Sequence, residues 1–192
     1  LTRCKKRLEI LGEVINDLLK LGLKRMVADE TAFHPVDVSV ILKSVGDLHS
    51  ARASEKGVDM FFHMEDSIPE VMADEKLVDD LFTNLISNAI KYTPSGGKVT
   101  VVLAREKENR IRFEIADTGI GIPKSEIPRL FSEFFRAENA KAFSEEGTGL
   151  GLVIVKEALD RLKGSITVES TPGEGTCFVC YIPIGKPGNE KR

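Results

Sequence analysis

The chain has little of what several protein classes require. Its 192 residues contain three cysteines and no tryptophan, aromatic residues make up 6%, and the formal net charge is −3. Three cysteines are too few for a disulfide framework, and the negative charge excludes the basic surface that nucleic-acid backbones require. No apolar run approaches the length needed to cross a bilayer, and no signal segment opens the chain. We therefore expect no nucleic-acid partner and no membrane contact by this stretch of chain.

Two of the cysteines, Cys177 and Cys180, have a spacing that other proteins use for zinc or redox chemistry. Residues 176–182 read as a strand, in which positions three apart face opposite sides of the sheet, so the two thiols cannot bind one metal ion. We interpret both as small core-filling residues in a reducing cytosol, and we expect a cytoplasmic location. The chain begins at Leu1 rather than Met, which favours a piece of a longer protein that could carry a membrane anchor elsewhere.

Apolar residues make up 42% of the chain and charged residues 30%, which is ordinary for a globular protein with one substantial core. Residues 1–30 lack turn signals, and their apolar side chains recur at the 3-4-3 spacing of a helical seam. A lone helix of this kind needs a partner, so we favour half of a dimeric bundle over a helix packed on its own domain. Periodicity, caps and turns predict the remaining elements. They are helices over 37–56, 74–91, 127–135 and 149–163, strands over 58–62, 70–73, 98–105, 110–116, 166–170 and 176–183, and a mobile loop over 137–146.

The order of these elements predicts an α+β fold. We expect a two-layer α/β sandwich, in which a mixed sheet is covered by helices on one face and preceded by one long helix. The predicted parts are a leading helix at 1–31, a domain at 32–185 and a disordered tail at 186–192.

Three glycines at alternate positions, Gly147, Gly149 and Gly151, form a candidate phosphate site. The chain has no Gly-x-x-x-x-Gly-Lys-Ser/Thr motif, and the glycine spacing misses the dinucleotide-binding fingerprint. Without Cβ atoms these residues still let an anion approach the main chain, and the helix that begins there directs unpaired N–H groups toward it. The alternative is a plain glycine-rich entry to a helix.

Asn84 and Asn88 lie four residues apart on one face of a predicted helix, where asparagine is unfavourable without a specific role. An amide oxygen is a hard ligand that suits Mg²⁺, which retains most of its waters while it bridges phosphates. Lys91 follows three residues later, close enough to meet the same phosphates. The alternative is a pair of amides on the helix surface.

Asp117 ends a predicted strand and precedes a glycine turn at 118–123. A carboxylate held there can accept a hydrogen bond from the exocyclic amine of adenine, whereas guanine presents a carbonyl at that position. The alternative is that Asp117 only forms the turn.

Together these segments resemble the ATP-binding domain of sensor histidine kinases, in the GHKL superfamily shared with DNA gyrase, mismatch-repair ATPases and heat-shock chaperones. The resemblance runs from about Phe33 to Ile184. It includes an N box at 84–92, G1 at 117–121, an F box at 130–136, G2 at 147–151 and G3 at 173–176. It implies the Bergerat fold, with a lid between the F box and G2, and a leading helix similar to the second helix of a dimerisation hairpin.

The resemblance also implies roles for individual residues. Asn88 would hold Mg²⁺, Lys91 would contact phosphate and Tyr92 would stack beside adenine. Asp117 would read the adenine amine, and Arg136 would reach the γ-phosphate. The residues implied in catalysis are Asn84, Lys91 and Arg136; those implied in nucleotide binding also include Gly119, Gly121, Ile122, Gly147, Thr148, Gly149, Leu150, Gly151 and Thr176.

Asn84 distinguishes phosphotransfer from hydrolysis within this resemblance. ATPases of the superfamily carry a glutamate one turn before the magnesium asparagine, and an amide cannot accept a proton from water at neutral pH. The phosphoryl group would then pass to a protein acceptor, with catalysis mainly by positioning and charge neutralisation.

The chain lacks a match to the family's phosphoacceptor histidine, because His34, His49 and His63 do not fit its pattern. We therefore expect the ATP-binding catalytic part of a two-component sensor kinase, whose histidine lies on a hairpin outside this chain. Its expected partners are ATP or ADP, its own hairpin in a homodimer, and a response regulator. The alternatives are a serine kinase of the anti-sigma-factor type and a non-catalytic nucleotide-sensing module.

Overall fold

The computed structural model describes most of the predicted domain. It describes Gly12, Ile15, Leu19 and Gly22, and then residues 33–107, 109–144 and 147–185. The four isolated residues are helical, in agreement with the predicted leading helix. The rest of 1–31 and the predicted tail at 186–192 lie outside the described residues. Within the described ranges, no helix combines the length and apolar character that a membrane span needs.

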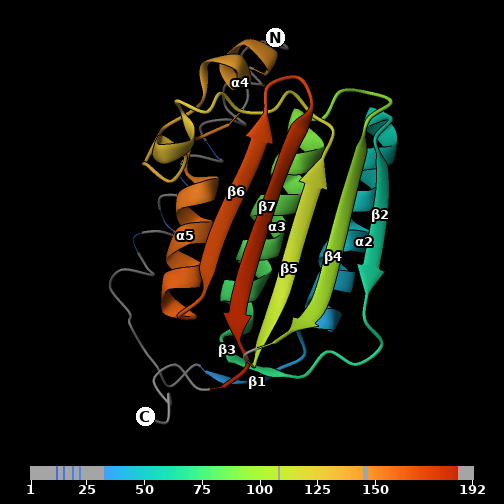
Figure 1. The fold of residues 1–192 in the computed structure, drawn as a ribbon, viewed down its shortest axis with the longest axis vertical. Coiled ribbons are helices and arrows are strands. Elements are labelled where there is room, and N and C mark those ends of the chain that lie inside the picture. The colour runs from blue at the N-terminus through green and yellow to red at the C-terminus, as the bar shows by residue number, and fades with distance from the viewer. Residues whose placement is uncertain are drawn as a thin grey trace.

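A five-stranded mixed sheet forms one layer of the domain (Figure 1). In spatial order its strands are β2 (Asp59–Met64), β4 (Lys98–Glu106), β5 (Arg110–Asp117), β7 (Gly175–Pro183) and β6 (Ser165–Thr171). β2 runs parallel to β4, and every other neighbouring pair is antiparallel. The helices α2 (Val38–Lys56), α3 (Glu75–Tyr92) and α5 (Gly151–Arg161) cover one face, so the predicted two-layer sandwich is confirmed.

The helix boundaries follow from their caps. Asp37 caps α2 by accepting a hydrogen bond from the Ser39 amide, and α2 ends at Gly57, which has a left-handed φ of 72°. Asp74 caps α3 in the same way, through the Lys76 amide. Both helices therefore begin and end within a residue of the predicted positions.

The core lies between the sheet and these helices. On β4 and β5 every second side chain is buried, as on a sheet with one covered face. The rings of Phe82 on α3 and Phe113 on β5 have centroids 4.5 Å apart. Cys180 is fully buried in this core, whereas Cys177 is only half-buried on the other face of β7, so the predicted separation of the two thiols is confirmed.

A second, two-stranded sheet is an addition to the predicted elements. It pairs β1 (His34–Val36) with β3 (Val71–Ala73) in antiparallel register. Pro35 conceals β1 in the sequence, because proline has no N–H to donate to a strand ladder. A strand with a partner on one side only tolerates this loss.

The helix predicted over 127–135 is wrong beyond its first turn. Only η2 (Ile127–Arg129), a 3₁₀ turn, forms there. Phe134 has a φ of 59°, which lies in the left-handed region and cannot continue an α-helix. The apolar spacing of this segment therefore reflects packing within a loop.

The prediction of unstructured chain over 137–146 is also wrong in part, because α4 (Glu138–Phe143) forms within it. This six-residue helix has no buried side chain and no apolar period. At its first residue, the Glu138 amide donates to the Glu126 carboxylate at 3.3 Å. Contacts from outside the helix, rather than its own sequence pattern, hold α4.

Candidate functional site

A cavity of about 270 Å³ lies at the end of the sandwich where β5 ends and α5 begins, the upper end in Figure 1. Its walls come from α3, α5, the end of β5, the start of β7 and the segment that carries α4. All but two of the predicted site residues line it: Asn84, Asn88, Lys91, Tyr92, Asp117, Gly121, Ile122, Arg136, Gly147, Thr148, Gly149, Gly151 and Thr176. Residues far apart in sequence therefore meet where the sequence predicted a nucleotide site.

The amide pair of α3 faces the first turn of α5 across this cavity. The Asn84 Nδ2 donates to the Asp80 carbonyl at 2.7 Å, which directs Oδ1 toward Gly151. A Cβ added at Gly151 would lie 2.8 Å from that Oδ1 and 3.7 Å from the Asn88 Nδ2. The glycine thus makes room for both amides to face the cavity.

Asp117 lies at the end of β5, in the wall formed by β5 and β7. Its Oδ1 accepts a hydrogen bond from the Gly119 amide at 2.8 Å. Burial raises the pKa of the Asp117 carboxyl to about 6, although hydrogen bonds from the Gly119 and Thr176 amides favour the ionised form. When ionised, this buried carboxylate is only partly hydrated, so it remains able to accept a further hydrogen bond from a ligand.

The turn after Asp117 is fixed by close backbone contacts. Gly121 has a φ of 61°, and a Cβ there would collide with the Thr171 carbonyl. The Ile122 amide donates to the Ser170 hydroxyl at 2.8 Å. Gly119, predicted as a binding residue, does not line the cavity and instead orients the Asp117 carboxylate from behind.

The glycine turn before α5 has left-handed φ angles of 117° at Gly147 and 74° at Gly149. A Cβ at Gly147 would collide with the Lys91 Nζ and lie 3.7 Å from the Arg136 Nε. Two cationic side chains therefore lie close to Gly147, which has no side chain of its own. Leu150, predicted as a binding residue, is fully buried with Val153 and Ile154 and does not line the cavity.

Arg136 and Asn139 connect α4 to the cavity. The Arg136 guanidinium donates to the carbonyls of Ala140 at 3.4 Å and Ser144 at 2.5 Å. The Asn139 Nδ2 donates to the Gly121 carbonyl at 2.8 Å. The short helix is thus joined to both the cationic and the Asp117 sides of the cavity.

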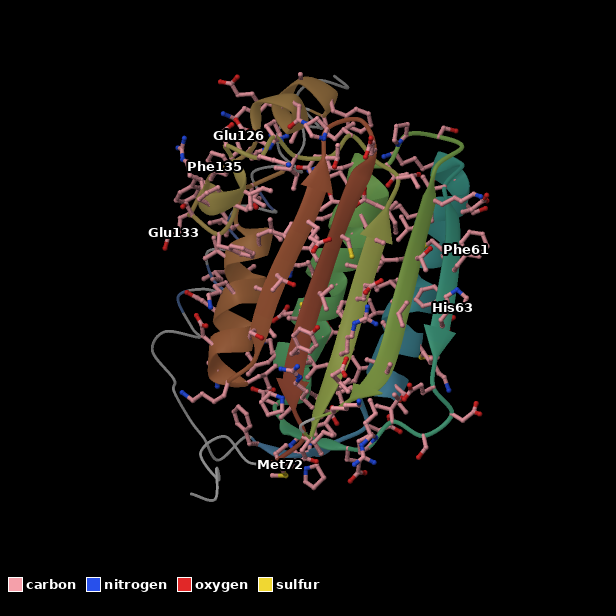
Figure 2. All side chains as sticks on the ribbon, viewed as in Figure 1. Phe61, His63, Met72, Glu126, Glu133 and Phe135 are labelled. Carbon is pink, nitrogen blue, oxygen red and sulfur yellow. The ribbon has the colours of Figure 1, made fainter. Side chains whose placement is uncertain are left out.

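Several lining residues were not predicted. They include Arg52, Ser87, Ile120, Leu130, Phe135, Asn139, Leu152 and Phe178. Ser87 lies on the cavity-facing side of α3 between Asn84 and Lys91, so helical spacing could have found it. Phe135 lies with Glu126 and Glu133 at the end of the molecule that holds α4 (Figure 2). The others come from elements whose packing no local pattern reveals.

None of the three histidines lines the cavity. His34 lies on β1, and His63 lies on the edge strand β2, beside Phe61 (Figure 2). His49 is buried in α2, and burial, followed by the nearby charge of Arg52, lowers its pKa. The expectation that this chain does not hold its own acceptor histidine is consistent with this geometry.

The chain is similar to curated sensor kinases. Over 182 residues the chain is 32% identical to the adaptive-response sensory kinase SasA of Rippkaea orientalis, which covers 95% of this chain and 46% of that protein. It is also 32% identical over 185 residues to the sensor histidine kinase AtsR of Burkholderia thailandensis, covering 95% of this chain and 30% of that one. The chain therefore spans less than half the length of these curated relatives.

The chain is also similar in structure to solved histidine kinases. Full-length ShkA in complex with AMPPNP superposes with a TM-score of 0.80 and 29% identity, over 97% of this chain and 38% of that one. The mycobacterial sensor histidine kinase MprB superposes with a TM-score of 0.71 and 28% identity, over 80% of this chain and 100% of the other. Residues 73–186, more than half of the chain, match the family described as histidine kinase-, DNA gyrase B- and HSP90-like ATPase. The chain belongs to this family of ATPases.

Proposed function

We propose that this chain is the ATP-binding catalytic part of a sensor histidine kinase. In this role it transfers the γ-phosphoryl group of ATP to a histidine on a helical hairpin outside the described residues. The observation that carries the proposal is the convergence of Asp117, the amide pair of α3 and the glycine turn before α5 on one cavity. The kinase relatives and the AMPPNP complex of ShkA support ATP as the nucleotide.

Adenine would bind at the Asp117 side of the cavity. The carboxylate can accept a hydrogen bond from the exocyclic amine, and Tyr92, the last residue of α3, lines the same cavity. A buried, ionised acceptor favours a donor over the carbonyl that guanine presents. This end of the cavity therefore selects the base.

The phosphates would bind between α3 and the glycine turn. Lys91 lies directly against Gly147, and the main chain there is open to an anion. The amide pair also suits Mg²⁺, because the Asn84 Oδ1 is directed toward Gly151 and the Asn88 side chain, whose amide carries an oxygen ligand, lines the same cavity. When bound, Mg²⁺ would neutralise charge on the phosphates, and Asn88 would hold it.

The small number of acidic side chains that line the cavity favours phosphotransfer over hydrolysis. Asp117 is the one carboxylate residue lining it within the described ranges, and its place beside Gly119 suits base recognition. Asp80, one turn before Asn84, does not line the cavity. Asn84 stands one turn before Asn88, where a water-activating carboxylate would be needed, so no described residue at that position can act as a general base for water, and positioning the acceptor becomes the main catalytic factor.

The rest of the proposal concerns the whole protein. Residues 1–31 would form the second helix of a dimerisation hairpin, residues 32–185 the catalytic domain, and 186–192 a tail. The full-length protein would be a homodimer that passes its phosphoryl group to a response regulator.

Radiolabelled ATP tests the reaction type. The chain is incubated with Mg²⁺, labelled ATP and a separately produced hairpin with the acceptor histidine, and a hairpin with that histidine changed to alanine is the matched control. We expect an acid-labile, base-stable label on the first hairpin only, and slow release of phosphate in its absence. Rapid ATP turnover that is independent of the hairpin would show that the chain is a hydrolase instead.

A further inference from the structure

One cation of the cavity comes from outside the motifs that define the site. Arg52 lies on α2, and it is the one residue of that helix that lines the cavity. Its side chain is exposed, so it lies at the rim. No hydrogen bond or salt bridge joins its guanidinium to another described residue. Arg52 is therefore not engaged by a described partner, and its guanidinium is available to a ligand that enters the cavity.

Two contacts fix this part of α2 against the cavity end of α3. One turn after Arg52, the Lys56 Nζ donates to the carbonyls of Ile90 at 2.8 Å and Lys91 at 2.5 Å. Ala53, the neighbour of Arg52, is buried in the core. Because Arg52 and Lys56 lie four residues apart on one helical face, Arg52 projects from the face of α2 that is fixed beside Ile90 and Lys91 at the end of α3.

The charges lining the cavity are unevenly distributed. Three cationic side chains, Arg52, Lys91 and Arg136, line it, and Asp117 is the one described carboxylate. Asp117 lies at the β5–β7 side, whereas Lys91 and Arg136 meet at Gly147. A ligand whose one end is a neutral base and whose other end carries several negative charges complements this arrangement.

The other two cations are already engaged where the structure describes them. Arg136 binds the carbonyls of Ala140 and Ser144, and the Lys91 Nζ lies 5.2 Å from the centre of the Tyr92 ring. Arg52 is available without the loss of such a contact. A guanidinium can bind two oxygens of one phosphate at once, which gives it more orientational selectivity than an ammonium group has.

We propose that Arg52 is a third phosphate-binding cation, which contacts the terminal phosphate of bound ATP and favours ATP over ADP. This inference rests on the proposed function, because it assigns a residue to the same nucleotide. It places the terminal phosphate near α2, at the exposed rim of the cavity, where an acceptor side chain can reach it. The contribution is electrostatic and partly solvent-exposed, so it weakens at high salt.

Calorimetric titration with ATP, ADP and AMP in the presence of Mg²⁺ tests the inference on the full chain. We expect Arg52→Gln to weaken ATP binding about three- to tenfold, ADP binding by less than about twofold, and AMP binding not at all. Arg52→Lys retains the charge and should recover part of the loss. Arg105→Gln is the matched control, because this exposed arginine lies at the opposite end of β4 and its loss should leave all three affinities unchanged.

The outcomes separate this inference from the proposal on which it rests. If the unmodified chain binds none of the nucleotides, the proposed function fails. If it binds ATP and Arg52→Gln keeps the same ratio of ATP to ADP affinity, Arg52 does not contact the terminal phosphate. Equal weakening of ATP, ADP and AMP would also overturn the inference, and unchanged AMP binding by the variant shows that it is folded.

Discussion

The two sides of the cavity are built in different ways. On one side, α3, β5 and β7 present Asn84, Asn88 and Asp117 from long elements whose alternate faces are buried in the core. On the other side, residues 130–144 and 147–150 consist of turns, the short helix α4 and three residues with left-handed φ. The first side has its shape without a ligand, whereas the second is held by a few polar contacts. Under the proposed function, base recognition belongs to the first side, and contact with the phosphates involves both.

Matched glycine substitutions should show this difference most strongly. Gly121→Ala places a methyl group at a φ of 61° against the backbone of Thr171 and Pro172, at the end of β6. We expect a loss of about 3 kcal/mol of unfolding free energy and a fall in Tm of about 6–12 °C. Gly147→Ala instead meets the flexible end of Lys91, and we expect a loss of about 1 kcal/mol with weaker ATP binding.

Thermal unfolding followed by circular dichroism, together with ATP titration, checks both variants. An equal fall in Tm for the two would contradict the distinction between a rigid and an adaptable side.

Asp117→Asn should separate binding from stability on the rigid side. The change replaces an ionised acceptor with an amide that can present a donor, so we expect ATP affinity to fall about ten- to a hundredfold, or about 1.5–3 kcal/mol. Because burial raises the pKa of Asp117 from 3.8 to about 6, its ionisation lowers the stability of the fold as the pH rises between these two values, and the full cost is present at pH 7. The neutral asparagine removes this cost, so the variant should unfold at the same temperature or a higher one at pH 7.

Titration with ATP and a thermal melt at pH 7 measure the two effects. Unchanged ATP affinity in the folded variant would remove Asp117 from the site.

The smallest expected effect is on the adaptable side. Arg136→Ala removes the donors to the Ala140 and Ser144 carbonyls, so we expect amides near the end of α4 to exchange about three- to tenfold faster. Transfer to the hairpin should slow more than ADP binding weakens, because ADP has no γ-phosphate for the guanidinium to meet. Arg136→Lys keeps the charge without the planar fork and serves as the comparison. Unaltered exchange together with unaltered transfer would argue against both roles.

The sequence predicted the first side of the cavity better than the second. The broad buried face of α3 and the alternation of β4 and β5 come from core burial, which leaves a strong periodic signal, so these elements and their polar residues were found. The segment 127–144 carries apolar residues without burying a regular face, and its helix at 138–143 depends on Glu126 and Arg136. Such contacts join residues through space, and a local pattern does not contain them.

Arg52 and Asn139 are single residues that a local sequence pattern could not assign to the cavity. Each reaches the cavity because a helix is packed in a particular place, and neither belongs to a motif. β1 was missed for a different reason, since Pro35 is a breaker in most contexts and is tolerated there at a strand with one partner.

The burial of Asp117 has a thermodynamic consequence for any measurement of ATP association. Near pH 6 about half of the empty molecules carry a proton on this carboxyl, because its pKa is raised to about that value. Donation by the adenine amine stabilises the ionised form, so association expels that proton into the solvent. The heat recorded near pH 6 then includes the protonation enthalpy of the buffer, and the apparent enthalpy differs between buffers while the intrinsic one stays the same. Well above pH 7 the carboxyl is already ionised, and this dependence on the buffer disappears.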